Sequence, residues 1–403
     1  MKVRGALFAA GVLLLLLLTA VVPRAVAQTP DPISTPPPQL TEEPRQETLE
    51  ARVLTATPPN PCGGGIEASG FEQQCQRLEL LVTEGSIKGQ RIAIEEGQLP
   101  VANRAGIYYK PGDRVLVDWI SGGDQGSAFY ITDFIRTDGL LVLAAVYVVL
   151  AVIFGGLKGL SSLLGLTISF AIIFFFVLPR IVAGDDPVFI SVLGALAIML
   201  ATLYLSHGFS LKTTAALMGT SISLVLTGLL AWVAVEIVRL SGFGSEEAMY
   251  IQIAQGGAIN LRGILLGGII IGALGVLDDI TISQSAAVFE MKRIDPALGW
   301  RRLFSHAVSI GRDHIAATTN TLVLAYAGAS LPLLILFVTG TDPWTRVVNL
   351  EIVAEEVVRT LVGTIGLMAS VPVTTALAAW LATKRPPPPL PEGHTGHAHG
   401  HHH

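Results

Sequence analysis

The chain has 403 residues, of which 51% are hydrophobic and only 14% are charged, and its mean hydropathy is +0.59. Because soluble globular proteins carry about 25% charged residues, this composition excludes a chain that is soluble over its whole length. The net charge of −5 and the lack of a block of Lys and Arg exclude a nucleic-acid-binding surface.

The first 27 residues have the layout of a secretory signal peptide. Lys2 and Arg4 precede an apolar run, and the small-residue sequence Ala-Val-Ala ends at Ala27. The apolar stretch 5–22 also comes close to the length of a membrane span, so an uncleaved first anchor is the alternative. Both interpretations export the segment that follows.

The exported segment begins with a linker and continues as a β domain. Residues 28–50 are rich in Pro, Thr and Glu, which predicts a disordered linker. Over residues 51–137, short alternating runs separated by Gly and Pro predict about five strands. We therefore expect a small β-barrel or sandwich, and an OB-like barrel is one topology that fits.

Both cysteines of the chain, Cys62 and Cys75, lie in this exported segment. An even number of cysteines in an oxidising compartment favours a disulfide, which would join Cys62 to Cys75. Two free thiols without a role are the alternative.

Residues 138–383 hold one apolar block after another, separated by Gly- and Pro-containing breaks. Since a spanning helix needs about 20 mostly apolar residues, the predicted fold class is a polytopic α-helical membrane protein. About seven spans are expected, at 138–156, 159–183, 187–206, 211–239, 261–290, 313–338 and 355–383.

The charges of the loops predict the orientation of these spans. Basic residues gather in alternate loops, at Lys158, at Lys212 and in 292–302, whereas Asp185 and Asp186 occupy an opposite loop. The positive-inside rule then places the β domain outside and the C-terminal tail in the cytoplasm. We expect a multi-pass membrane protein.

Two adjacent carboxyl groups, Asp278 and Asp279, interrupt the apolar span 261–290. A carboxylate at membrane depth costs about 2.5–3.5 kcal/mol, so it is rare without a partner or a role. Burial and mutual repulsion both disfavour the charged form, which suits proton exchange. A span that ends early, leaving both aspartates at the cytoplasmic interface, is the alternative.

The same span carries a face of small residues. Gly268, Gly272 and Gly275 lie at steps of three or four from Asp279 and share its helical face. Small residues let two helices approach closely. The pattern predicts that a neighbouring helix covers this face and places Asp279 against protein instead of lipid.

The next span is polar near its start, and His314, Thr318 and Thr321 share one helical face there. Threonines that bond their own backbone and an interfacial histidine are the alternatives to a relay. The expected proton- or ion-coupling residues are Asp278, Asp279, His314, Thr318, Thr319 and Asn320. Residues expected to contact a solute are Asn260, Arg262, Ser283 and Gln284, although charge anchoring also accounts for Arg262.

The cytoplasmic tail 384–403 is rich in Pro and His. Its histidines would bind a divalent metal such as Zn, Ni or Cu, with a cloning remnant as the alternative. They are His394, His397, His399, His401, His402 and His403. No other cofactor is expected. The chain shows none of the motifs GxSxG, HExxH or the P-loop, so we expect no enzymatic activity.

Three stretches carry a resemblance to the YibE/F-like family of bacterial membrane proteins. They are GGLKGL (155–160), LRGILLGGIIIGALGVLDDITISQ (261–284) and GRDHIAATTNTLVLAYAGASLP (311–332). The resemblance extends over about residues 85–383. The family carries no assigned activity, so the resemblance implies the architecture and leaves the function open.

A weaker similarity connects the chain to the transmembrane core of SecD/SecF and related RND permeases. The order of elements is similar: Asp278 and Asp279, then 289–293, then Arg312 before a Thr-rich helix, then 363–372. The similarity implies a proton-coupled core. The exported domain is smaller here and only one half-bundle is present, so a homodimer would have to supply the second half.

These observations, with the resemblance to a bacterial family, predict a proton- or ion-coupled permease of the bacterial plasma membrane whose substrate is unknown. Its expected partners are the lipid bilayer, a small solute or ion, and further copies of the chain. One alternative is an export or envelope-assembly factor driven by the proton gradient. A second is a membrane scaffold that transports nothing.

Overall fold

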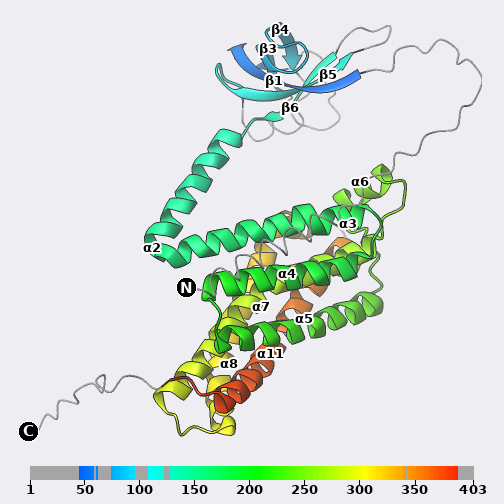
Figure 1. The fold of residues 1–403 in the computed structure, drawn as a ribbon. Coiled ribbons are helices and arrows are strands. Elements are labelled where there is room, and N and C mark those ends of the chain that lie inside the picture. Colours follow the sequence, from blue (N-terminus) through cyan, green and yellow to red (C-terminus); the bar gives the residue numbers. More distant parts are fainter. Residues whose placement is uncertain are drawn as a thin grey trace, which may run out of the picture. The chain divides into compact units, whose positions relative to one another are not determined.

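The computed structural model describes residues 45–58, 60–61, 74–96, 108–121, 128–340 and 343–388. These residues form two compact units (Figure 1). The first is a β-sheet unit that ends at Val149, within a long helix. The second is a helical unit that begins at Leu150. Cys62 and the six histidines of the tail lie outside the described residues.

The first unit is built on an antiparallel sheet in which β1 is central. The strand order is β2-β3-β1-β5-β6, and β4 pairs with β3. The strands are β1 Arg45–Ala56, β2 Asn60–Pro61, β3 Gln74–Glu84, β4 Arg91–Glu96, β5 Arg114–Ser121 and β6 Ala128–Phe134. β1 begins six residues inside the stretch expected to be linker. Among the described strands no pairing joins β4 to β6, so the OB-like barrel stays a prediction.

Alternation of apolar and polar residues explains how this sheet forms its core. On β1, Leu49, Ala51 and Val53 are buried while the residues between them face outward. Gly85 and Gly89 have φ angles of 117° and 87°, which the turn from β3 to β4 requires and which glycine adopts without strain. Cys75 is on β3 opposite Asn60 of β2, and no described cysteine is free. Its pairing with Cys62 stays a prediction.

Helix α2 (Thr137–Ile172) follows β6 after only two residues. The guanidinium of Arg114 holds the start of this helix, because it bonds both Glu50 on β1 and Asp138 on α2 at 3.0 Å. α2 continues through a π-helical turn, η2 (Ile173–Val177), into α3 (Leu178–Val182). It bends at Gly156, whose φ of 55° and ψ of −138° lie outside the helical region.

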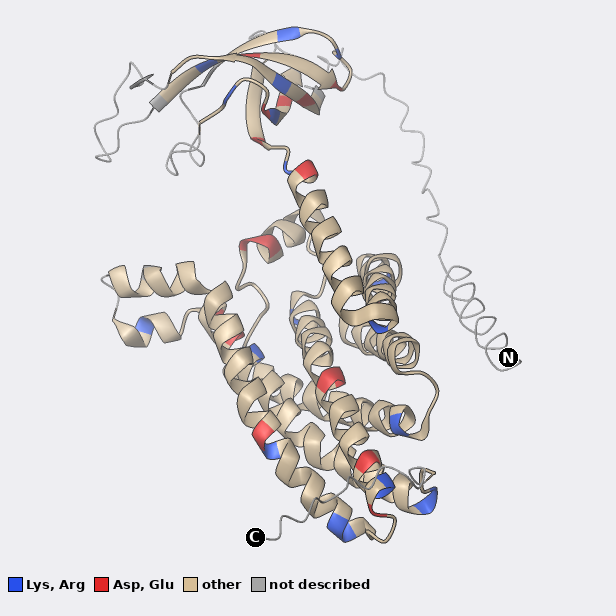
Figure 2. Ribbon diagram, turned by 90° about the vertical axis from the view of Figure 1, so that its left-hand side faces the viewer, with Lys and Arg blue, Asp and Glu red and all other residues tan. Residues whose placement is uncertain are grey.

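The helical unit continues with long apolar helices. Figure 2 shows long stretches of them without a charged residue. The helices are α4 Pro187–His207, α5 Leu211–Val238, α6 Glu246–Ala254, α7 Leu261–Ile294, α8 Trp300–Ala329, α9 Leu331–Thr339, α10 Trp344–Val348 and α11 Glu351–Lys384. Within the described residues, five helices are long and apolar enough to cross a membrane, or six if α8 and α9 form one span bent by 70°. These helices fit a membrane protein.

The expected number of about seven spans differs from these five or six helices, and two features of the chain explain the difference. The expected spans 138–156 and 159–183 form one helical stretch of 46 residues, bent at Gly156. The expected span 313–338 is broken at Ser330, between α8 and α9. Pro332 explains the break, because it has no N–H to bond the carbonyl of Gly328 and its ring clashes with that carbonyl. Apolar length and Gly- and Pro-containing breaks divided the sequence into spans, and neither signal shows whether a break ends a helix or bends it.

Helix α7 lies at the centre of the helical unit and packs against α4, α5, α8 and α11. Small residues allow this close packing. A Cβ atom at Gly219 of α5 would lie 2.3 Å from Thr374 Oγ1 of α11, and one at Gly267 of α7 would lie 2.3 Å from Ser191 Oγ of α4. These helix interfaces therefore require glycine at the contact positions, because any larger residue would clash with the neighbouring helix.

Candidate functional site

One face of the central helix α7 is exposed, while most of its other side chains are buried or half-buried. Its exposed positions up to residue 283 follow the helical repeat: Gly268, Gly272, Gly275, Asp279 and Ser283. We call these five residues the α7 stripe. Nothing lies within 4 Å of a Cβ atom built at Gly268 or Gly275. Within the described residues no helix packs closely on these two glycines, so a neighbouring helix that covers this face stays a prediction.

The stripe is open because α8 packs mainly on α11 and diverges from α7, which leaves a groove between α7 and α8. A pocket of about 250 Å³ lies in this groove. Its lining residues are Gly275, Val276, Asp279, Ile280, His314, Thr318, Thr321, Leu322 and Ala325. We call it the α7–α8 groove.

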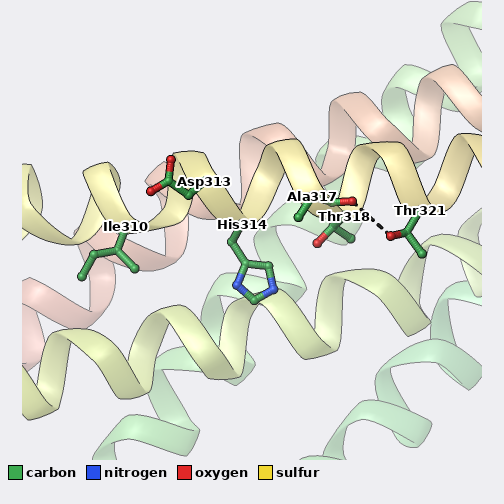
Figure 3. Close-up of a pocket in the computed structure, with 6 residues that line it drawn as sticks. All are labelled: Ile310, Asp313, His314, Ala317, Thr318 and Thr321. Carbon is green, nitrogen blue, oxygen red and sulfur yellow. Dashed lines mark hydrogen bonds between the residues drawn. The ribbon is translucent and has the colours of Figure 1, made fainter.

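A second pocket, of about 520 Å³, adjoins the groove along α8. It shares His314, Thr318 and Thr321 with the first and is also lined by Ile310, Asp313 and Ala317. Figure 3 shows His314 pointing away from Asp313, and the Thr321 hydroxyl donating to the carbonyl of Ala317 at 3.1 Å. Thr321 thus bonds its own backbone, as one of the two sequence-based interpretations expected.

The structure brings together only part of the expected coupling set. Asp279, His314 and Thr318 line the α7–α8 groove. Thr319 and Asn320 line neither pocket, although the hydroxyl of Thr319 is enclosed without a partner. The register explains the difference, since successive helix residues point about 100° apart.

Asp278 faces away from the groove, toward α4. Its Oδ2 atom lies 3.4 Å from the hydroxyl of Thr202, and its Oδ1 atom is enclosed without a hydrogen-bond partner. The two adjacent carboxyl groups therefore meet different neighbours instead of forming one site. The helix does not end at them, because α7 continues to Ile294.

The four expected solute contacts are spread along α7. Asn260 caps the helix, accepting a hydrogen bond from the Gly263 N–H at 3.0 Å. Arg262 forms an ion pair with Glu236, which agrees with charge anchoring. Ser283 is exposed on the α7 stripe. They do not form one site.

Gln284 is the fourth of these residues, and it is buried. Its amide donates to the carbonyl of Ala307 on α8 at 2.7 Å and to the hydroxyl of Thr375 on α11 at 2.8 Å. Gln284 therefore joins three helices. This role leaves its amide bonded within the protein instead of free for a solute.

Tyr326 was missed by the sequence analysis. Its hydroxyl lies 3.9 Å from the position of a Cβ atom at Gly272, so it faces the α7 stripe. The helical spacing of His314, Thr318 and Leu322 leads on toward this tyrosine, and that signal could have found it. Thr202, the neighbour of Asp278, offered no such signal, because its position depends on how α4 packs.

The groove places a carboxylate, an imidazole and a hydroxyl about halfway along two long helices. Such groups can transfer protons or bind a small polar solute at a depth where the surrounding lipid offers no polar group. In the described part of the chain, no cluster of three or more His, Cys, Asp or Glu could hold a metal ion.

Comparison with curated proteins and with solved structures found no match for the chain. The model of one protein family, described as YibE/F-like protein, matches residues 143–384. This match covers more than half of the chain and leaves strands β1–β6 outside it. The protein therefore belongs to the YibE/F-like family.

Proposed function

We propose that the protein is a proton- or ion-coupled secondary transporter of the bacterial plasma membrane. The observation that carries this proposal is the α7–α8 groove, in which Asp279 and His314 line one pocket between apolar helices. Polar groups facing a cavity at membrane depth are typical of ion and solute pathways. The substrate is a small solute or ion.

The glycines of the α7 stripe support a path along the groove. Gly268, Gly272 and Gly275 present backbone without side chains, so a solute can move close to the helix toward Asp279. Tyr326 faces this path at Gly272 and would narrow it. By the positive-inside rule, the Asn260 end of α7 faces outward and the Ile294 end faces the cytoplasm.

Proton uptake in proteoliposomes tests the proposal. Purified protein is reconstituted, a pH gradient is imposed, and candidate solutes are added in turn. We expect proton uptake that depends on one solute and that Asp279→Asn abolishes. Glu290→Gln is the matched control, because Glu290 is an exposed carboxyl group about three turns further along α7. It should transport as the wild type does.

Two results would contradict the proposal. One is proton uptake in Asp279→Asn equal to that of the wild type. The other is a folded wild-type protein that moves no proton with any solute.

An export or envelope-assembly factor is the second candidate, favoured by the Arg114 bonds that tie the sheet to α2. Co-purification of a secreted client without solute transport would support it.

A further inference from the structure

Two lysines and a histidine lie together where α4 ends and α5 begins. His207 is the last residue of α4, and Lys212 is the second residue of α5, after a turn of only three residues. His207 lies within electrostatic reach of Lys212 and also of Lys158 on α2. We call these three residues the cationic corner.

The packing of α2 on α4 independently places Lys158 at this level. A Cβ atom at Gly165 of α2 would lie 3.6 Å from Thr202 Cγ2 and 3.8 Å from Ser206 Oγ on α4. The two helices run in opposite directions, since α4 follows α3 after four residues. Seven residues before Gly165, about 10 Å along the helix, the chain reaches Lys158 beside the end of α4.

The charge of the corner is not neutralised within the protein. Lys158 and Lys212 are exposed, and neither forms an ion pair anywhere in the described ranges. The one described carboxylate that acts on His207 is Asp279. The corner therefore holds more positive than negative charge, and it can accept an anion.

Apolar side chains surround the corner. On α2, Leu157, Leu160 and Leu164 have exposed fractions of 87%, 44% and 49%. At the turn, the exposed Phe209 stacks on Tyr204 with ring centroids 4.2 Å apart. An anion bound here lies beside surface that only a hydrocarbon chain would cover. A phospholipid supplies both the charge and the chains.

We propose that Lys158, His207 and Lys212 bind the phosphate of an anionic phospholipid whose acyl chains lie on the leucines of α2. Lysine binds phosphate as a point charge, and basic pockets between spanning helices are known to hold anionic headgroups. The proposal rests on the membrane embedding that the apolar helices indicate. It does not depend on transport.

Lipid titration of the full chain tests the proposal. The protein is placed in phosphatidylcholine nanodiscs with increasing phosphatidylglycerol, and bound lipid is counted by native mass spectrometry. We expect the double variant Lys158→Gln/Lys212→Gln to bind phosphatidylglycerol roughly 25-fold more weakly, about fivefold for each lysine. The matched control is Lys384→Gln/Arg385→Gln, which removes two exposed cations at the end of α11 and should bind as the wild type does.

Either of two outcomes would overturn the proposal. If the double variant binds phosphatidylglycerol as tightly as the wild type, the corner holds no headgroup. If inorganic phosphate displaces the lipid at equal concentration, the site is one for a free anion. Both lysines are exposed, so the variants should melt as the wild type does in phosphatidylcholine alone. Because no pH gradient is applied, the result is independent of the transport assay.

Discussion

At the scale of single residues, one step along α7 decides which neighbour a carboxyl group meets. Asp278 faces Thr202 on α4, whereas Asp279 faces the α7–α8 groove with His314. The sequence showed that both were unusual in an apolar helix. It could not show which helix stands on each side, because that depends on packing between distant parts of the chain.

Some glycines of the helical unit lie against a neighbouring helix, and others lie where no neighbour is close. At Gly219 a Cβ atom would lie 2.3 Å from Thr374 Oγ1, so Gly219→Ala must push α5 and α11 apart. We expect a loss of about 1–3 kcal/mol in the free energy of unfolding, as for other overpacked cores. Thermal unfolding in detergent measures it.

The control for this prediction is Gly268→Ala, on the open α7 stripe. Nothing lies within 4 Å of its Cβ atom, and alanine favours a helix over glycine. This variant should be no less stable than the wild type. Equal losses in both variants would contradict the packing role assigned to Gly219.

At the scale of secondary structure, the turn between β3 and β4 is fastened to β1 by a carboxylate. Glu47 accepts hydrogen bonds from the hydroxyl of Ser86 and from its N–H, the latter at 2.8 Å. These bonds favour the ionised form and hold the pKa of Glu47 below its ordinary value. The stabilisation from these hydrogen bonds is fully present at pH values above the ordinary pKa of a glutamate. It is lost as the pH falls through the lowered pKa of Glu47 in the folded protein.

An NMR titration of the Glu47 carboxyl carbon checks this prediction. Ser86→Ala should raise the pKa of Glu47 toward its ordinary value, because it removes the side-chain donor. Thr48→Ala is the control, since the Thr48 hydroxyl bonds Asp118 at 2.7 Å and not Glu47. An unchanged pKa in Ser86→Ala would mean that the fastening does not form in solution.

The ends of most helices were predictable, because capping residues, proline and glycine occur in the sequence where these helices begin and end. The span expected at 187–206 is α4, which begins at Pro187 behind the capping carboxylate of Asp186 and ends before Gly208. The break after Ala329 was missed, although Pro332 signals it. Of the site, helical spacing predicted that His314 and Thr318 share a face. The α7–α8 groove itself was not predictable, because it depends on the packing of α8 against α11.

At the scale of the whole molecule, α2 runs from the sheet unit into the helical unit and bends at Gly156. The φ of 55° and ψ of −138° there suit glycine, and another residue would cost about 1–3 kcal/mol. We therefore expect Gly156→Ala to straighten α2. Spin labels at Val152 and Leu166, both exposed residues of the helical unit, measure this, since a straight helix would separate their Cα atoms by about 21 Å.

The wild type should show a shorter separation than this, and so should Gly155→Ala. Gly155 is the matched control, because its Cβ atom would meet nothing within 4 Å and its backbone is helical. If Gly156→Ala left the distance unchanged, the bend would have to come from packing instead of from the backbone of Gly156.

The junction between β6 and α2 has a mechanical consequence. Only Ile135 and Arg136 separate strand from helix, and Arg114 clamps the first helical turn to β1 and β5 through Glu50 and Asp138. The connection between strand and helix is therefore short, and no loop separates them. A load that twists the sheet would be passed to α2 as torque, and it would travel along the helix as far as Gly156. A binding event on the sheet would then be transmitted along α2 without any loop having to fold.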